Sequence, residues 1–249
     1  MKGKTYPRRG LHGEFVHDLG LRILRGELRP GDSLPMDEDP HGDLNVSRTV
    51  VREAVKVLAA KGLVEARPKT GTQVRSRVYW NLMDPDVLAW RLEADPDDGF
   101  FLDVSELRRV IEPAVAALAA RRASPEEVVE LERAFAEMEA SAPEYGETYI
   151  AADVRFHEII LEGCHNELLA HLGSTLRAVF RASFTRTRNL ADERTLALHR
   201  AVALAIGAGD SGAAEAAMME LIEVSAAYIA ESEPEGVKNS RSRSSRRRS

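Results

Sequence analysis

One carboxylate and two imidazoles are spaced so that they could bind a divalent metal ion. Asp153 and His157 are four residues apart, which places both on one face of a predicted helix. His199 lies in a later helical segment among apolar residues. Carboxylate oxygens and imidazole nitrogens are ligands that suit zinc or nickel. The alternative is that each histidine is a hydrogen-bonded core residue, the commoner role of a histidine on an apolar face.

A second group of side chains could contact DNA. The run from Ser47 to Ala60 predicts a helix, because serine is a good N-cap and apolar residues recur at three- and four-residue spacing. Arg48, Thr49 and Arg52 lie near the N-terminal end of this helix, off its apolar stripe. The recognition helix of a helix-turn-helix presents such donors to base edges and phosphates. An ordinary amphipathic helix with solvated arginines is the alternative.

A short hairpin is predicted directly after this helix. Residues 63–67 and 72–75 are the expected strands, and they flank a turn that contains Lys69, Thr70 and Gly71. A helix followed by a hairpin with a basic tip is typical of a winged helix-turn-helix.

Composition limits the class of protein. The 249 residues suffice for two modest domains, and the single cysteine, Cys164, excludes an intramolecular disulfide framework. No apolar run approaches the roughly 18 residues that span a bilayer, and the basic first ten residues lack the apolar core of a signal peptide. We therefore expect a cytoplasmic protein without a membrane partner.

The charges are divided unevenly along the chain. The net charge is +5 over residues 1–78, −17 over residues 79–237 and +6 over residues 238–249. Attraction to DNA phosphates is therefore expected at the N-terminal part and, without sequence preference, at the Arg/Ser-rich tail. Residues 238–249 contain no apolar residue, so this tail should be disordered. It could equally have no role.

The remaining pattern is helical. Apolar residues predict a first helix from Leu11 to Arg25, and the segment 36–44 is the expected supporting helix of the DNA-binding motif, shortened or distorted by Pro40. Six further helices joined by short loops predict an antiparallel bundle. These helices are expected at residues 103–122, 125–140, 146–163, 166–187, 191–207 and 210–231.

The predicted fold is thus mainly α, with an N-terminal winged helix-turn-helix and a C-terminal all-α antiparallel helical bundle. A linker with a short helix that begins at Pro85 should join them, its two tryptophans fastening it to the bundle. The expected boundaries are a flexible N-terminus at 1–10, the DNA-binding domain at 11–78, the linker at 79–102, the bundle at 103–232 and a disordered tail at 233–249.

Several motifs resemble the DNA-binding domain of the GntR family of bacterial transcription regulators. They are Val46-Ser-Arg-Thr-Val-Val-Arg-Glu-Ala54, Leu58-Ala-Ala-Lys-Gly-Leu-Val64 and Lys69-Thr-Gly-Thr-Gln-Val74. The resemblance implies a homodimer on a short palindromic operator, with Arg48 and Arg52 at bases or phosphates and the wing tip near the minor groove.

The second half of the chain resembles the FCD effector domain of the FadR-type subfamily. The motifs are Leu107-Arg-Arg-Val-Ile-Glu-Pro113, Ala152-Asp-Val-Arg-Phe-His-Glu158 and Leu198-His-Arg-Ala-Val-Ala-Leu-Ala-Ile206. The resemblance implies that Asp153, His157 and His199 hold a metal that a small carboxylate effector caps. Leu221 stands where the family commonly has a further histidine, so the three groups could instead hydrogen-bond the effector directly.

Two arginines are candidate partners of the effector's carboxylate. Arg108 is the first candidate, because a guanidinium pairs bidentately with a carboxylate and we expect it to face a polar cavity with few other partners. Arg177 is the second, with a solvated helix charge as the alternative. Residues 81–90 resemble the branch of the family that responds to galactonate and similar sugar acids.

The sequence therefore predicts a ligand-controlled regulator, a repressor of a catabolic operon. Two other interpretations stay open. One is a metal-dependent enzyme that uses Asp153, His157 and His199 around a zinc-bound water. The other is a degenerate family member that dimerises without a ligand.

Overall fold

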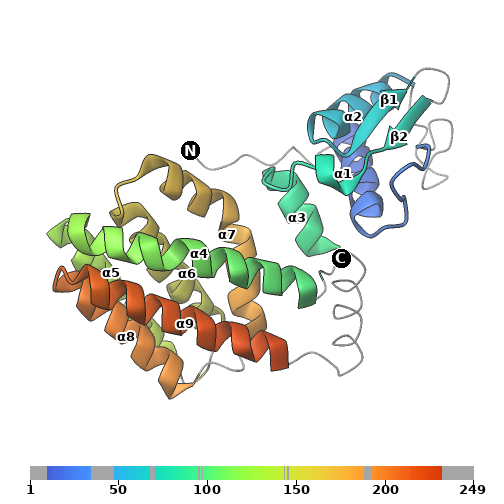
Figure 1. Ribbon diagram of the computed structural model, residues 1–249. Coiled ribbons are helices and arrows are strands. Elements are labelled where there is room, and N and C mark those ends of the chain that lie inside the picture. The colour runs from blue at the N-terminus through green and yellow to red at the C-terminus, as the bar shows by residue number, and fades with distance from the viewer. Residues whose placement is uncertain are drawn as a thin grey trace, which may run out of the picture. The chain divides into compact units, whose positions relative to one another are not determined.

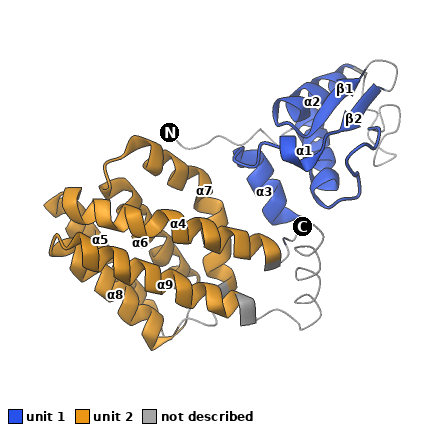
Figure 2. Cartoon of the chain, in the orientation of Figure 1, with its two compact units in different colours: residues 1–96 blue, residues 97–249 orange. Residues whose placement is uncertain are grey.

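The chain forms two compact units, residues 1–96 and residues 97–249 (Figures 1 and 2). The structure is a computed structural model that describes residues 10–34, 48–67, 71–94, 96, 98–142, 144, 146–187 and 192–231. The expected supporting helix at 36–44, the N-cap Ser47 and the wing residues Lys69 and Thr70 lie outside these residues.

Unit 1 is built on the packing of α1 (Leu11–Leu24) against α2 (Arg48–Ala60). Both helices are amphipathic, and their apolar stripes meet in one core. The stripe of α2 is the predicted one, with Val51, Ala54 and Leu58 buried and the residues between them exposed or half-buried. The predicted first helix is confirmed, and it ends one residue earlier than expected.

The wing is a two-stranded antiparallel sheet of β1 (Val64–Arg67) and β2 (Gly71–Val74). Its register pairs Val64 with Val74 and Arg67 with Gly71, which places both valines in the core of unit 1. Gly71 has a φ of 77°, the left-handed conformation that glycine adopts at little cost. The hairpin predicted from the sequence is therefore present.

The two tryptophans pack in unit 1, so the expectation that they fasten the linker to the bundle is wrong. Trp90 lies on α3 (Pro85–Glu93), and its ring packs directly over Gly20 of α1. Trp80 is 8% exposed and donates from Nε1 to the carbonyl of Arg75. Tertiary packing decides which unit the two tryptophans pack in. The local pattern of residues 79–92 does not reveal that choice.

A buried lysine fixes α3 to the end of α2. Lys61 Nζ is 2.8 Å from Asp84 Oδ1 and 2.5 Å from Asp86 Oδ2, and it lies 5.6 Å from the centre of the Trp90 ring. Burial alone would lower the pKa of Lys61, but hydrogen bonds to the two aspartates raise it. Asp84 also caps α3 by accepting from the backbone N–H groups of Asp86 and Val87.

Unit 2 is a bundle of helices in which α4 is central, since it packs against α6, α7, α8 and α9 (Figure 1). The helices of the described part of unit 2 are α4 (Asp98–Arg122), α5 (Pro125–Ser141), α6 (Glu147–Gly163), α7 (Glu167–Thr187), α8 (Glu193–Gly207) and α9 (Ser211–Glu231). The fold is mainly helical, as predicted. Capping boxes at Ser124 and Asp192 begin α5 and α8.

The largest difference from the predicted helices is at the start of α4, which begins at Asp98 instead of residue 103. Phe101 and Val104 are 6% and 5% exposed, so this first part of the helix has its own buried face. The residues expected as a linker, 79–102, therefore divide between the two units. In the described part of the chain, every helix is too short or too polar to cross a bilayer.

The packing of Trp90 on Gly20 gives a stability prediction. A Cβ added at Gly20 would lie 2.5 Å from Trp90 Cε3, so Gly20→Ala should lower the free energy of unfolding of unit 1 by about 1–3 kcal/mol. Because both tryptophans lie in unit 1, their fluorescence during urea denaturation measures this unit.

The control is the same substitution in a Trp90→Leu background. Without the indole, alanine in a helix should be favoured over glycine by up to about 1 kcal/mol. An equal loss of stability in both backgrounds would show that contact with Trp90 is not the cause.

Candidate metal and effector site

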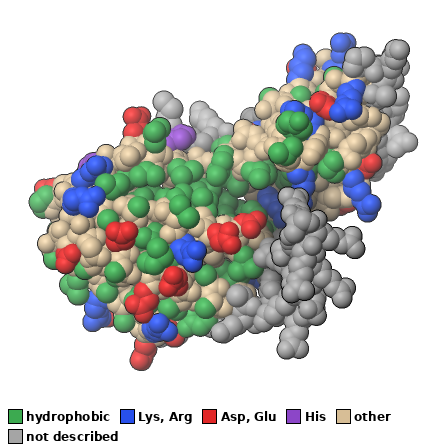
Figure 3. Space-filling model, in the orientation of Figure 1, with side chains coloured by type: hydrophobic (Ala, Val, Ile, Leu, Met, Phe, Trp, Pro, Cys, Tyr) green, Lys and Arg blue, Asp and Glu red, His purple; other side chains and the backbone are tan. Residues whose placement is uncertain are grey.

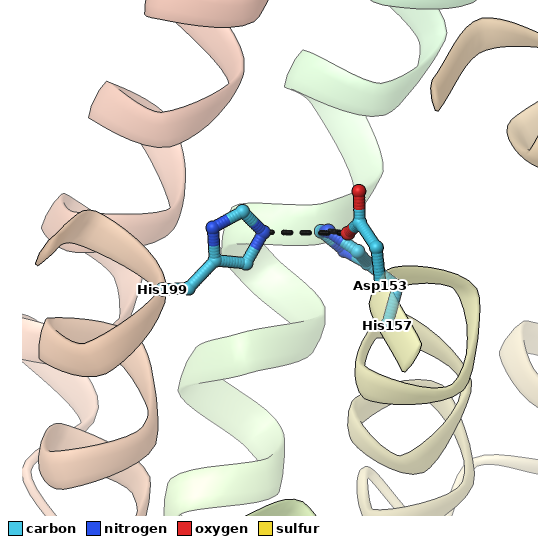
Figure 4. Close-up of side chains that lie close together, drawn as sticks. All are labelled: Asp153, His157 and His199. Carbon is cyan, nitrogen blue, oxygen red and sulfur yellow. Dashed lines mark ion pairs between the residues drawn. The ribbon is translucent and has the colours of Figure 1, made fainter. Parts of the chain in front are cut away.

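Two helices supply the candidate metal ligands. Asp153 and His157 lie one turn apart on α6, and His199 lies on α8 (Figure 4). All three side chains are buried, and the two histidines are each 3% exposed. Apolar neighbours on α6, with Phe156 at 0% and Ile160 at 2% exposed, carry this face of the helix into the core.

The three side chains converge on one carboxylate oxygen. His157 Nε2 is 3.4 Å and His199 Nε2 is 3.3 Å from Asp153 Oδ1. One ligand atom from each residue lies within 4.8 Å of the other two. The structure therefore brings together the residues that the sequence singled out, across 46 positions of the chain.

The other ring nitrogens face away from this point. His199 Nδ1 is 2.8 Å from the carbonyl oxygen of Thr195, which can only accept, so Nδ1 carries the proton and neutral His199 has its lone pair on Nε2. His157 Nδ1 is 2.8 Å from Glu112 Oε2, although the ring is not turned to give a well-aligned hydrogen bond. The Nε2 atom of each histidine therefore faces Asp153.

The sequence did not single out Glu112 as a member of the site. Glu112 is on α4, 2% exposed, and its carboxylate lies between His157 and Arg108. Arg108 Nε is 2.7 Å from Oε1 and Nη2 is 3.3 Å from Oε2. The spacing of the sequence could have indicated Glu112, because an arginine and a glutamate four residues apart share one helix face. Val104 and Ser105, which are close to that face, are buried.

Arg108 has close partners, so the expectation that it faces a cavity with few partners is wrong. Its side chain is 4% exposed and pairs bidentately with Glu112. The guanidinium carbon also lies 4.5 Å from the centre of the Phe184 ring and 5.8 Å from that of Phe180. Arg108 lies beside the cluster through Glu112, which already neutralises its charge.

The electrostatics of the cluster follow from burial and pairing. Burial raises the pKa of Glu112, but Arg108 and His157 outweigh it and hold that pKa at about 2. Burial likewise raises the pKa of Asp153, whereas His157 and His199 lower it to a net value well below the usual range. Burial lowers the pKa of His157, but Glu112 and Asp153 raise it above its ordinary value.

The residues present fit a bound cation. Asp153 Oδ1 and His199 Nε2 are buried, face each other and make no hydrogen bond within the described residues. A carboxylate oxygen and an imidazole lone pair are both acceptors, so a positive charge between them would stabilise the arrangement. With neutral imidazoles, Arg108, Glu112 and Asp153 sum to one negative charge. A proton on His157 would balance this charge, and a divalent cation would leave one positive charge.

One predicted effector-binding residue, Arg177, lies elsewhere, and Leu221 occupies the position where the family commonly has a further histidine. Arg177 is exposed on α7 and its guanidinium pairs with Glu158, so the structure does not bring it into the buried cluster. Leu221 is 1% exposed on α9, where it is part of the apolar core of unit 2.

The predicted DNA-contacting residues are only partly described. Thr49 and Arg52 are exposed on α2, on the side away from its buried stripe. The backbone of Arg48 begins α2, and the position of its side chain lies outside what the structure describes. Gly71 begins β2 and is exposed.

Comparison with known proteins agrees with this division into two units. The family model described as bacterial regulatory proteins, gntR family, matches residues 13–74, and the FCD domain model matches residues 103–224. The chain is 36% identical to the galactonate operon transcriptional repressor of Escherichia coli, over 87% of this chain and 96% of that protein. It is 31% identical to the transcriptional regulator LutR of Bacillus subtilis, over 79% and 91%.

One solved structure, of the Lar regulator that controls the agr system of Listeria monocytogenes, has a TM-score of 0.57 and covers 92% of this chain and all of its own. Its 18% identity shows the fold alone. The two family models and the relatives above 30% identity establish more: this chain belongs to the GntR family of bacterial transcription regulators and carries an FCD domain.

Proposed function

We propose that this DNA-binding regulator represses a catabolic operon and is controlled by a small carboxylate that binds in unit 2 together with a divalent cation. The observation that carries the proposal is the buried meeting of Asp153, His157 and His199, in which Asp153 Oδ1 and His199 Nε2 make no hydrogen bond. Family membership alone supports DNA binding; this cluster supports the control by a ligand.

The DNA-contacting surface in the proposal is the exposed side of α2 together with the wing. Val51, Ala54 and Leu58 hold α2 to its own unit, which leaves Thr49 and Arg52 free to approach a duplex. The net charge of +5 over residues 1–78 favours approach to phosphates. We place Ser47, Arg48, Lys69, Thr70 and Gly71 in the same contact surface on the resemblance to the family.

The cation in the proposal is zinc or nickel, held by one carboxylate and two imidazoles. Such a cation supplies a Lewis-acidic centre to which a further oxygen ligand binds. Three protein ligands leave at least one coordination position for that oxygen. The buried aromatic rings of Phe156 and Phe184 beside the two histidines exclude water, which strengthens electrostatic interactions within the site.

The charge of the site matches a monocarboxylate. Arg108 and Glu112 cancel, and a divalent cation with Asp153 leaves one positive charge. A carboxylate would neutralise it, whereas a neutral sugar would not. A relative with 36% identity represses a galactonate operon, so we propose a sugar acid such as galactonate as the effector. Because Glu112 already neutralises Arg108, we assign the effector's charge to the cation and not to an arginine clamp.

Control of DNA binding requires that the effector bind one arrangement of a homodimer more tightly than the other. A homodimer would present two copies of α2 to the half-sites of a palindrome, about one helical turn apart. Large apolar side chains on the surface of unit 2 support self-association, for example Val110 of α4, which is 75% exposed. Apolar side chains gather along α4 on the face drawn in Figure 3.

The sequence also left open a metal-dependent enzyme and a family member that works without a ligand. The family consists of transcription regulators, so the metal-dependent enzyme is set aside. A regulator that works without a ligand would need the cluster only for stability, with a proton on His157 in place of the cation. The sequence feature behind this alternative is Leu221, which stands where the family commonly has a further histidine and so leaves three protein ligands instead of four.

The DNA-contacting surface gives a first prediction. Arg52→Ala should raise the Kd for a duplex from the promoter upstream of the chain's own gene by roughly 10- to 100-fold, since one guanidinium contact to a base is worth about 1–3 kcal/mol. Fluorescence anisotropy at fixed salt measures this Kd. Arg177→Ala, which also removes one exposed guanidinium, should leave it unchanged. Equal effects of the two substitutions would contradict the assignment.

The cation site gives a second prediction. The wild-type chain should bind one zinc or nickel ion per protomer, and the ion should raise the Tm of unit 2. His199→Ala should abolish both effects, because it removes one of three ligands. His171→Ala, an exposed histidine on α7, is the control and should alter neither. Equal metal content in wild type and His199→Ala, measured by mass spectrometry of desalted protein, would argue against the site.

The effector gives a third prediction. Galactonate should weaken binding to the promoter duplex in the presence of the cation, and galactose, which lacks the carboxylate, should not. Removing the cation with a chelator should abolish the response to galactonate, because the carboxylate then has no unmatched positive charge to bind. The proposal fails if the metal-loaded protein responds equally to galactose and galactonate, or to no sugar acid.

A further inference from the structure

The two candidate histidine ligands are held in different ways. On α8, the ring of His199 is oriented by the backbone carbonyl of Thr195, one turn earlier on the same helix, at 2.8 Å. On α6, the ring of His157 has a side-chain oxygen from another helix at its Nδ1, Glu112 Oε2 at 2.8 Å. The first contact is part of the helix itself, and the second depends on the side chain at one position of α4.

Glu112 is rigidly held. Arg108, one turn before it on α4, binds both carboxylate oxygens, and the guanidinium in turn lies over the Phe184 ring. Phe184 also packs against His157, with ring centres 5.1 Å apart. Arg108, Glu112, Phe184 and His157 thus form a closed set of contacts that fixes both the carboxylate and the imidazole.

Glu112 contacts the nitrogen of His157 that faces away from the other ligands. The atom toward Asp153 is Nε2, and Glu112 is not one of the groups that converge on the candidate cation. A carboxylate at Nδ1 favours the tautomer that carries its proton there, which leaves the Nε2 lone pair for a metal. Both oxygens of the Glu112 carboxylate already accept from the Arg108 guanidinium, and a carboxylate in that pair offers His157 Nδ1 an acceptor.

We infer that Glu112, held by Arg108, is a positioning residue that fixes the tautomer and orientation of His157 for metal binding through Nε2. This inference rests on the cation site of the proposed function. It gives the buried Arg108–Glu112 pair a role other than binding the effector: the pair carries no net charge and supports one ligand of the cation.

The test compares two double variants that differ only at residue 112, the residue that offers an acceptor to His157 Nδ1. Arg108→Met/Glu112→Gln and Arg108→Met/Glu112→Met both remove the whole ion pair, so neither leaves a buried unpaired charge, and such replacements by groups of similar volume are often tolerated. Glutamine still offers an oxygen to His157 Nδ1, and methionine does not. The Kd for zinc, from competition with a chelating dye at pH 8, should be about 10- to 100-fold higher in the methionine variant.

The matched control is the pair Arg177 and Glu158, which is also a guanidinium with a carboxylate on the bundle but lies outside the cluster. Replacing both residues with methionine should leave the Kd for zinc unchanged. Equal zinc affinity in the glutamine and methionine variants at residue 112 would overturn the positioning role while leaving the cation site intact. Failure of the wild-type chain to bind either zinc or nickel would instead overturn the cation site, and the inference with it.

A second measurement needs no substitution. In the zinc-loaded wild-type protein, the ¹⁵N spectrum of His157 should show a protonated Nδ1 and a metal-bound Nε2. Zinc bound through Nδ1 would contradict the inference, because that nitrogen would then be unavailable to Glu112.

Discussion

The structure of unit 2 depends on the matching of charges that are buried where α4, α6 and α8 meet. Arg108, Glu112, Asp153, His157 and His199 are each at most 7% exposed, so none of them can rely on water to solvate its charge. Removing one partner from such a set typically costs about 3–5 kcal/mol, because the remaining charge is left buried and unpaired. A protein that needed only a stable bundle would fill this volume with apolar side chains, such as the buried Leu221 and Ile222 of α9. The polar cluster therefore supports the proposal that a ligand binds there.

The DNA-binding unit is organised by a smaller buried ion pair of the same kind. Lys61, at the end of α2, binds Asp84 and Asp86 at the start of α3, and Trp90 of α3 packs on Gly20 of α1. Because α1, α2 and α3 share these contacts, the helix that presents Arg52 and the helix that precedes unit 2 in the chain belong to one packed body.

The sequence predicted the fold where periodicity is strong and failed where tertiary packing decides. The stripe of Val51, Ala54 and Leu58 is a local signal, and the structure agrees with it. No local pattern indicates which unit Trp80 and Trp90 pack in, and the prediction that they fasten the linker to the bundle was wrong. Spacing also selected Asp153 and His157, and the ability of a guanidinium to pair bidentately with a carboxylate selected Arg108. Glu112 escaped notice because a glutamate four residues after an arginine usually marks an exposed ion pair, and only the packing of α4 in the bundle buries it.

The central claim is that this cluster binds a divalent cation through one carboxylate oxygen and two Nε2 atoms. An anomalous difference map from crystals of the full chain grown with zinc and galactonate, recorded at the zinc edge, tests it most directly. The account predicts one strong peak per protomer, bonded to Asp153, to His157 and His199 through Nε2, and to a carboxylate oxygen of galactonate. Well-ordered side chains at these three residues with no anomalous peak between them would contradict it.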